Sequence, residues 1–305
     1  MASLNAWLRR TIGRTLGEGQ GNCLADFGGL PIFDPPVLGI ADGDDGIFAV
    51  FREVVAPGHL LPRELLERER PAARKGARVS VVSWALPFRE EVRLSNRTSD
   101  WPSALYSVAR NNGGAWNRGL AGRLVEGLQK EGFSAVAPML VDTYDVFRLP
   151  GAVFGSTWSE RHVAYAAGLG TFGLNGFLIT PLGAMARLGS LVTDAPLDVG
   201  PDRPADHRAA CLADGGRDCG LCLGRCPAGA VSAVGLDKEA CYRRREEIRG
   251  RSLGPYAERY LMIPSEIIKG GRRVPGFSLG CALCASDVPC EDRDPFVAKA
   301  GLSRA

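Results

Sequence analysis

Cysteines are the residues of this 305-residue chain whose spacing most clearly predicts chemistry. Eight of its nine cysteines lie between residues 211 and 290. The run Cys219-Gly-Leu-Cys222-Leu-Gly-Arg-Cys226-Pro227 has the C-x-x-C-x-x-x-C-P spacing with which thiolates hold four-iron clusters. That pattern usually opens with one more cysteine close by, whereas here Cys211 stands beyond the segment 212–218. The first ligand is therefore expected on a loop.

The remaining cysteines complete two sets of four. In chains with two clusters, the cysteine before the proline ligates the other cluster, so Cys226 needs partners further along. Eight thiolates are the number that two [4Fe–4S] clusters require, which leaves Cys23 over. The predicted first set is Cys211, Cys219, Cys222 and Cys290, and the predicted second set is Cys226, Cys241, Cys281 and Cys284.

Zinc is the alternative metal, because paired C-x-x-C units also form tetrahedral sites with four sulfur ligands. Zinc motifs need neither the third cysteine three residues on nor the proline after it, so the spacing favours iron–sulfur clusters. Disulfides are disfavoured because nothing marks the chain as secreted, and clustered cysteines in a cytosolic protein more often bind metal or do redox work.

Composition allows a full core. With 45% hydrophobic residues, the length suits one large domain, expected over residues 1–200, and a small cysteine-rich domain over residues 201–305. The formal charge of +3 would fall to about −1 with two clusters, because each four-iron core with its thiolates carries about −2. Net charge therefore gives no argument for a nucleic-acid partner.

Targeting signals are weak. No apolar run approaches the length of a membrane span. Arg9 and Arg10 are followed by a charged, glycine-rich stretch over residues 13–21, where an export signal needs an apolar core. We expect a cytoplasmic protein that does not engage a membrane.

Several elements must position the cysteines. Residues 37–41 and 78–86 predict buried strands, residues 116–132 predict a helix, and residues 134–141 predict a further strand. Thr157 and Glu160 predict a capping box for a helix that ends at Gly168, a position expected in the left-handed conformation.

A glycine-rich turn follows that helix. Its G-x-G-x-x-G spacing does not indicate a dinucleotide site, because that fingerprint must follow a strand and open a helix, whereas this run closes a helix. Two interpretations remain open, namely close approach of the backbone to a large flat ligand, or a tight turn. The candidate cofactor-binding residues are Gly168, Leu169, Gly170, Gly173 and Asn175.

Other polar residues carry weaker signals. A lone histidine is more often structural than functional, and His162 is the one considered for a cavity. Basic strips over residues 243–251 and 269–273 could hold a phosphate backbone, but a solvated charged helix is the favoured interpretation.

Residues 134–290 resemble the epoxyqueuosine reductases. The shared features include Glu160-Arg161, the glycine turn, Thr193-Asp194 and Cys226-Pro-Ala-Gly-Ala-Val231. Members of that family, and the cobalamin-dependent reductive dehalogenases that they are similar to, have a nitroreductase-like cobalamin-binding domain followed by a ferredoxin-like module with two [4Fe–4S] clusters. The resemblance implies an α+β fold of this kind, cobalamin against the glycine turn, and an external low-potential electron donor of the ferredoxin or flavodoxin type.

The chain departs from the family at three places. Five residues separate Cys284 from Cys290 where the family has three, and the 39-residue segment before Cys281 is longer than the family's. The family's aspartate, its proposed proton donor, falls on Phe154, whose ring cannot donate a proton. Candidate donors nearby are Asp142, Tyr144, Asp145 and His162.

Two functions from different classes follow. The first is an anaerobic iron–sulfur reductase, in which clusters supply single electrons and a corrinoid supports reduction of a small or nucleoside-like substrate. The second is an electron-transfer or activating protein that lacks the corrinoid and serves a partner. A true epoxyqueuosine reductase acting on tRNA is a further alternative, which Phe154 disfavours.

Overall fold

A four-stranded sheet lies at the centre of the computed structural model, which describes residues 3–17, 21–149, 152–214, 218–250, 266–269, 272–275 and 280–296. The strand order is β3 (Val37–Asp42), β4 (Ser80–Pro87), β10 (Ala186–Thr193) and β5 (Ala135–Val136), and all neighbours are antiparallel. Every residue of β4 is buried, which confirms the expectation from its apolar and β-branched run.

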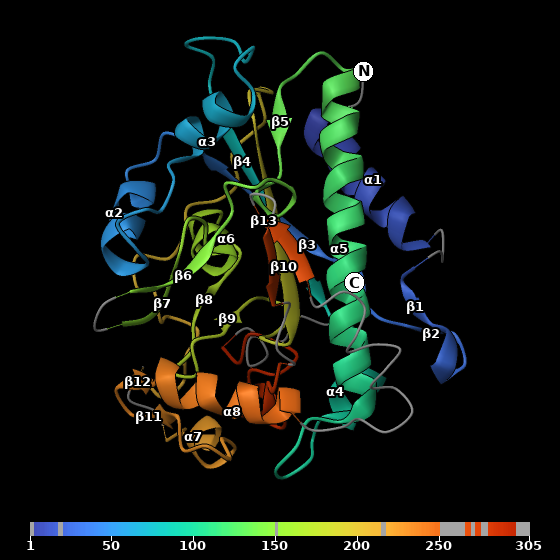
Figure 1. Cartoon of the computed structure of the whole chain (residues 1–305), viewed down its shortest axis with the longest axis vertical. Helices are drawn as coiled ribbons and strands as arrows, with labels where there is room; N and C mark the ends of the chain where they lie inside the picture. The colour runs from blue at the N-terminus through green and yellow to red at the C-terminus, as the bar shows by residue number, and fades with distance from the viewer. Residues whose placement is uncertain are drawn as a thin grey trace.

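Helices cover both faces of the sheet (Figure 1). On one side lie α5 (Ala104–Lys130) and α1 (Leu4–Gly17), and on the other lie α2 (Ile47–Val54), α3 (Pro62–Glu69) and α6 (Glu160–Ala166). Because strand side chains alternate between faces, Val82 and Trp84 of β4 join the core beneath α5, whereas Val81 joins the core beneath α6. The result is a mixed α/β architecture.

The other elements are short and form the edges of the molecule. In chain order they are β1 (Cys23–Leu24), η1 (Ala25–Phe27), β2 (Leu30–Pro31), α4 (Glu90–Ser95), η2 (Pro138–Leu140), β6 (Val146–Leu149), β7 (Ala152–Ser156), β8 (Thr171–Phe172), β9 (Leu178–Ile179), α7 (Leu221–Gly224), β11 (Val231–Ser232), β12 (Gly235–Leu236), α8 (Lys238–Gly250), β13 (Glu266–Lys269), β14 (Arg272–Pro275) and η4 (Leu283–Ala285).

The long helix α5 begins twelve residues before the predicted start at residue 116. Ser103 caps it, since its hydroxyl accepts the backbone N–H of Tyr106 at 3.0 Å. Gly113 does not break the helix, because tertiary packing uses it: a Cβ there would lie 2.5 Å from the Phe33 ring.

Two further expectations need correction. The strand predicted over residues 134–141 is reduced to β5, because Pro138 opens the turn η2. The capping box is also wrong, since Ser159 is the N-cap and the Thr157 hydroxyl instead donates to the carbonyl of Thr143 at 2.8 Å. The left-handed conformation of Gly168 is confirmed, with φ at 70°.

The cysteine-rich part lies against one end of the sheet. Figure 1 shows α7 and α8 at the lower end of the molecule. Ala282 and Ala285, from the loop over residues 280–296, belong to the same hydrophobic core as Trp84 of β4. This loop is therefore built into the sheet's core, while the domain boundary at residue 200 stays a prediction. None of the described helices is both long and apolar enough to cross a bilayer.

Candidate functional site

The structure gathers the eight cysteines around two separate cavities. A small cavity is lined by Cys211, Cys219, Cys222 and Cys290, together with Gly173 and Asn175. A large cavity of about 530 Å³ is lined by Cys226, Cys241, Cys281 and Cys284. These groups have the same members as the first and second sets defined from the sequence. Cys23 lines neither cavity and lies in β1.

The thiols within each set act on one another's pKa values, and Cys222 of the first set also acts on Cys284 of the second. Burial, and then the neighbouring Cys222, Cys211 and Cys219, raise the pKa of Cys290 to about 12. Burial also raises the pKa of Cys281 to about 11, and its thiol neighbours are Cys226 and Cys241. Thiols held protonated in this way become thiolates only when a bound metal compensates their charge, so metal binding would release protons.

The thiols in each set surround a space and do not meet at a point. Across the described residues, no three Cys, His, Asp or Glu side chains converge closely enough to hold a single metal ion. Four thiols around a shared cavity fit a four-iron cluster, whose ligands bind the corners of a core of iron and sulfide.

Asparagine side chains hold the loop that carries Cys281 and Cys284. Asn96, just after α4, donates from Nδ2 to the carbonyl of Cys281 at 3.2 Å and to Ser286 Oγ at 2.9 Å. Asn175 Nδ2 donates to the carbonyl of Cys284 at 2.9 Å. Residues far away in sequence therefore fix the backbone of the second set.

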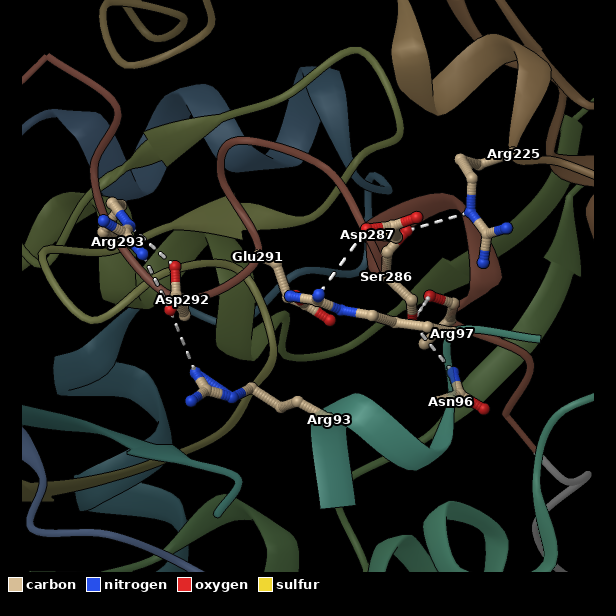
Figure 2. Close-up of polar contacts among 10 residues, drawn as sticks. Arg93, Asn96, Arg97, Arg225, Ser286, Asp287, Glu291, Asp292 and Arg293 are labelled. Atoms are coloured by element: carbon tan, nitrogen blue, oxygen red, sulfur yellow. Dashed lines mark hydrogen bonds and ion pairs between the residues drawn. The ribbon is translucent and has the colours of Figure 1, made fainter. Parts of the chain in front are cut away.

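Ion pairs from the α4 region hold the end of this loop, beside Cys290 (Figure 2). Arg97 Nη2 lies 2.5 Å from Glu291 Oε2, and Arg93 Nη1 lies 3.9 Å from Asp292 Oδ2. Glu291 is only 2% exposed, so loss of Arg97 would leave a buried carboxylate without its main counter-charge.

The large cavity has a cationic wall. Among the described residues that line it there is no Asp or Glu. The cationic side chains are Arg110, Arg161, Arg187, Lys238, Arg244 and Arg245. The aromatic side chains are Phe88, Tyr106, Phe154, Phe177 and Tyr242. The arrangement suits a ligand that has both an anionic group and a flat apolar part.

Arg110 and Arg187 are half-buried in this wall, and Arg161 is exposed at its edge. Burial, followed by repulsion from Arg187, lowers the pKa of Arg110 to about 9. Burial likewise lowers the pKa of Arg161 and that of Arg187. The Arg161 guanidinium lies 5.1 Å from the centre of the Phe177 ring.

Phe154 lies in the wall of the same cavity. Its ring packs against Tyr242 of α8, with 4.7 Å between ring centroids, and Arg148 lies 5.5 Å from its centroid. The position at which the related family has an aspartate therefore presents an apolar surface to the cavity.

The predicted proton donors lie elsewhere. Asp142 is exposed, in agreement with its interpretation as a solvated loop residue. Asp145 precedes β6, and its backbone N–H donates to Oγ1 of Thr157, which follows β7, at 2.7 Å. Tyr144 does not line the cavity, and burial, with the nearby Glu160, raises its pKa to about 12.

His162 is half-buried against aromatic side chains and is not among the described residues that line the large cavity. Its ring packs against Phe51 and Phe172 at centroid distances of 5.3 and 5.0 Å, and its Nδ1 lies 2.7 Å from Ser159 Oγ. Burial, with repulsion from His59, lowers its pKa to about 3, so the imidazole is neutral at pH 7. The cavity-facing role considered for His162 stays a prediction.

The glycine turn packs against the chain's own backbone. A Cβ at Gly168 would lie 2.8 Å from the carbonyl oxygen of Pro201, and one at Gly170 would lie 2.1 Å from that of Ile179. Leu169 is buried. Of the five candidate cofactor residues, only Asn175 is among the described residues that line the large cavity. Asn175 and Gly173 both line the small cavity. This packing favours the tight turn over a cradle for a flat ligand.

Sequence reasoning missed Arg110 and Arg187. A signal existed for Arg187, because it stands in a strand whose other residues are mostly apolar, as a charge with a special role would. The basic strip was also interpreted incompletely: Arg243 is exposed, but Arg244 and Arg245 on the same helix face the cavity.

Glu160 is a further buried group that the sequence did not single out for its charge. No donor in the described structure makes a hydrogen bond with either of its carboxylate oxygens. Burial raises its pKa to about 7, although the nearby Ser190 hydroxyl opposes the shift. This carboxyl holds its proton to near-neutral pH.

Comparison with known proteins supports one relationship. No family model matches the chain. The epoxyqueuosine reductase of Staphylococcus aureus (strain NCTC 8325 / PS 47) is 37% identical over 94 residues, which are 30% of this chain and 22% of that protein. The epoxyqueuosine reductase of Listeria monocytogenes serovar 1/2a is 30% identical over 156 residues, which are 49% of this chain and 38% of that protein. The matched region spans less than half of either relative.

Among solved structures, an epoxyqueuosine reductase from Streptococcus thermophilus shares 13% identity at a TM-score of 0.42, covering 97% of this chain and 70% of that one. A catabolic reductive dehalogenase shares 15% identity at a TM-score of 0.43, covering 68% of this chain and 27% of that one. The sequence matches confirm the resemblance to the epoxyqueuosine reductases, and the loose structural likeness adds no separate argument.

Proposed function

We propose that this chain, a divergent relative of the epoxyqueuosine reductases, is an iron–sulfur reductase with two [4Fe–4S] clusters. The first and second sets of thiols hold one cluster each, and electrons pass singly through them to a small or nucleoside-like substrate in the large cavity. The observation that carries the proposal is that two sets of four thiols, each drawn from crossed sequence positions, line one cavity each, and that the cavity of the second set has a volume of about 530 Å³.

The chain's own residues have defined tasks in this reaction. Arg161 and Arg245 lie near the thiols of the second set and offset the negative charge of a cluster there. Phe88 and Phe154 present apolar surface that excludes water from the bound substrate. An external low-potential donor of the ferredoxin or flavodoxin type supplies the electrons.

Cobalamin, which the family resemblance implies, fits the described residues poorly. The glycine turn expected to face a corrinoid packs against backbone. The cavity of about 530 Å³ falls within the range for drug-sized ligands, and a corrinoid is much larger than such a ligand. No step of the proposed reaction is therefore assigned to a corrinoid.

Anaerobic reconstitution with iron and sulfide tests the proposal. We expect about eight irons per chain and a broad visible absorbance that bleaches with dithionite. Retention of zinc without sulfide would reject the clusters. Cobalt analysis after incubation with cobalamin tests the corrinoid directly, and stoichiometric binding would restore it to the reaction.

A true epoxyqueuosine reductase is the second candidate, favoured by the names of the two curated relatives. The apolar ring of Phe154 argues against it, as no carboxyl group stands among the described residues of the cavity wall to donate a proton. We expect the chain not to restore queuosine in a cell that lacks its epoxyqueuosine reductase. Complementation by the unmodified chain would make this second candidate the function.

A further inference from the structure

The glycine-rich turn ends at Asn175, a buried residue that lies between the two sets of thiols. Among the described residues that line the two cavities, Asn175 alone lines both. Its exposed fraction is 2%. Its amide bonds the backbone of Cys284, a thiol of the second set whose pKa is raised in part by Cys222 of the first set. Asn175 therefore stands at the junction of the two proposed clusters.

The turn is built to place this side chain. The backbone N–H of Gly173 donates to the carbonyl of Phe177 at 2.9 Å, and that of Gly176 donates to the carbonyl of Gly173 at 2.8 Å. Gly176 closes the turn with φ at 71°. A Cβ at Gly173 would lie 2.9 Å from Asn175 Oδ1, so a larger residue there would displace the amide. The position of Asn175 explains these glycines without a flat ligand.

The Asn175 amide makes two hydrogen bonds and keeps one donor. Its Nδ2 donates to the carbonyl of Cys284 at 2.9 Å, and its Oδ1 accepts the backbone N–H of Phe177 at 3.1 Å. An amide nitrogen carries two donors, and the second N–H has no acceptor among the described residues. A buried donor without a partner is unfavourable. The sulfurs of a cluster bound to Cys284 would supply the missing acceptor.

We infer that Asn175 is a positioning residue for electron transfer between the two clusters, because its amide holds Cys284 in place and its remaining N–H donates to a sulfur of the second cluster. The inference rests on the proposed function and deepens it. In the electron step the first cluster loses one electron and the second gains it, and the external low-potential donor then reduces the first cluster again. A hydrogen bond to a cluster sulfur stabilises the reduced form, because reduction adds negative charge to the acceptor. Asn175 thereby raises the potential of the second cluster and draws electrons towards the large cavity.

Pulsed paramagnetic resonance of the unmodified protein tests the contact directly. The protein is produced with isotopically labelled asparagine nitrogen, reconstituted anaerobically with iron and sulfide, and reduced with dithionite. We expect a hyperfine coupling between an asparagine nitrogen and a reduced cluster, and the loss of that coupling in Asn175→Leu. Absence of any such coupling in the unmodified protein would overturn the inference without a variant.

Redox titration of the same proteins tests the consequence. Asn175→Leu should lower one of the two midpoint potentials, by the equivalent of a roughly tenfold change in the reduction equilibrium. Asn175→Asp should lower it further, because its carboxylate places a negative charge where the electron must arrive. Unchanged midpoint potentials in both variants, at full iron content, would contradict the inference.

Asn117 supplies the matched control. It is also 2% exposed, its Nδ2 donates to the carbonyl of Leu188 at 2.9 Å, and its Oδ1 accepts the Nε1–H of Trp84 at 2.7 Å. It is not among the described residues that line either cavity. Asn117→Leu should lower the thermal midpoint and leave both potentials unchanged. An equal shift of potential in Asn96→Leu, which frees only the Cys281 end of the loop, would show that anchoring alone sets the potential and would overturn the inference.

Iron content measured on the same samples separates this inference from the proposed function. About eight irons per chain, with the same potentials in the Asn175 variants as in the unmodified protein, reject the role of Asn175 and keep the reductase. An unmodified protein that takes up no cluster rejects both.

Discussion

Replacing Cys290 by alanine should remove the cluster of the first set and spare that of the second. Cys290 follows Cys284 by only six positions, yet the two thiols line different cavities. Between them Asp287 adopts a left-handed conformation with φ at 58°, which reverses the loop. The crossed ligation that we propose would use this turn to bring neighbouring cysteines to different clusters.

The size of the effect follows from the grouping. The thiols that raise the pKa of Cys290 are Cys222, Cys211 and Cys219, with which it lines the small cavity, so its loss leaves three ligands in the first set and four in the second. Iron should fall from about eight to about four per chain, with sulfide in proportion.

The assay combines iron and sulfide analysis with paramagnetic resonance of the dithionite-reduced protein. The spectrum should change from that of two interacting clusters to that of one. Full iron content in the Cys290→Ala protein would refute the crossed sets, and so would loss of the second cluster with retention of the first.

Three further predictions concern single side chains. Cys23→Ser should keep full iron, because this thiol lies in β1 outside both cavities, and any loss of iron by analysis would contradict the ligand count. Gly183→Ala should lower the thermal midpoint and the iron content far more than Gly28→Ala does. Both glycines have positive φ, but a Cβ at Gly183 would lie 2.3 Å from the carbonyl oxygen of Glu291, which is next to Cys290. A Cβ at Gly28 would have no atom within 4 Å. Equal losses in the two variants would show that the positive φ, and not the contact with Glu291, causes the loss. Glu160→Gln should raise the thermal midpoint at pH 8 and raise it much less at pH 5. Burial raises the pKa of Glu160 to about 7 in the folded protein, from an ordinary value of 4.5. The wild-type protein therefore loses about 3 kcal/mol of stability as pH rises from the lower value to above the higher one. A variant that gains equally at both pH values would contradict the linkage.

Much of the fold was readable from local pattern. The strands over residues 37–41 and 78–86 appear as β3 and β4, because continuous apolar and β-branched runs have few alternatives to burial. The left-handed Gly168 was equally predictable, since few residues other than glycine adopt that conformation. Where local pattern failed, tertiary contacts prevailed, as at Gly113, whose packing against Phe33 continues a helix that glycine alone would weaken.

The sequence by itself predicted the two sets of cysteines that line the two cavities, because the C-x-x-C-x-x-x-C-P spacing implies two four-iron clusters and sends the cysteine before the proline to the second of them. Only the tertiary structure decided which other side chains share a cavity with them. Arg110 and Arg187 stand 77 positions apart and meet because α5 crosses the face of β10, while His162, on a predicted helix near the glycine turn, faces the aromatic core. The sequence near either arginine does not predict that the two meet. A cavity forms where distant elements converge, and which residues line it depends on tertiary packing that local spacing does not encode.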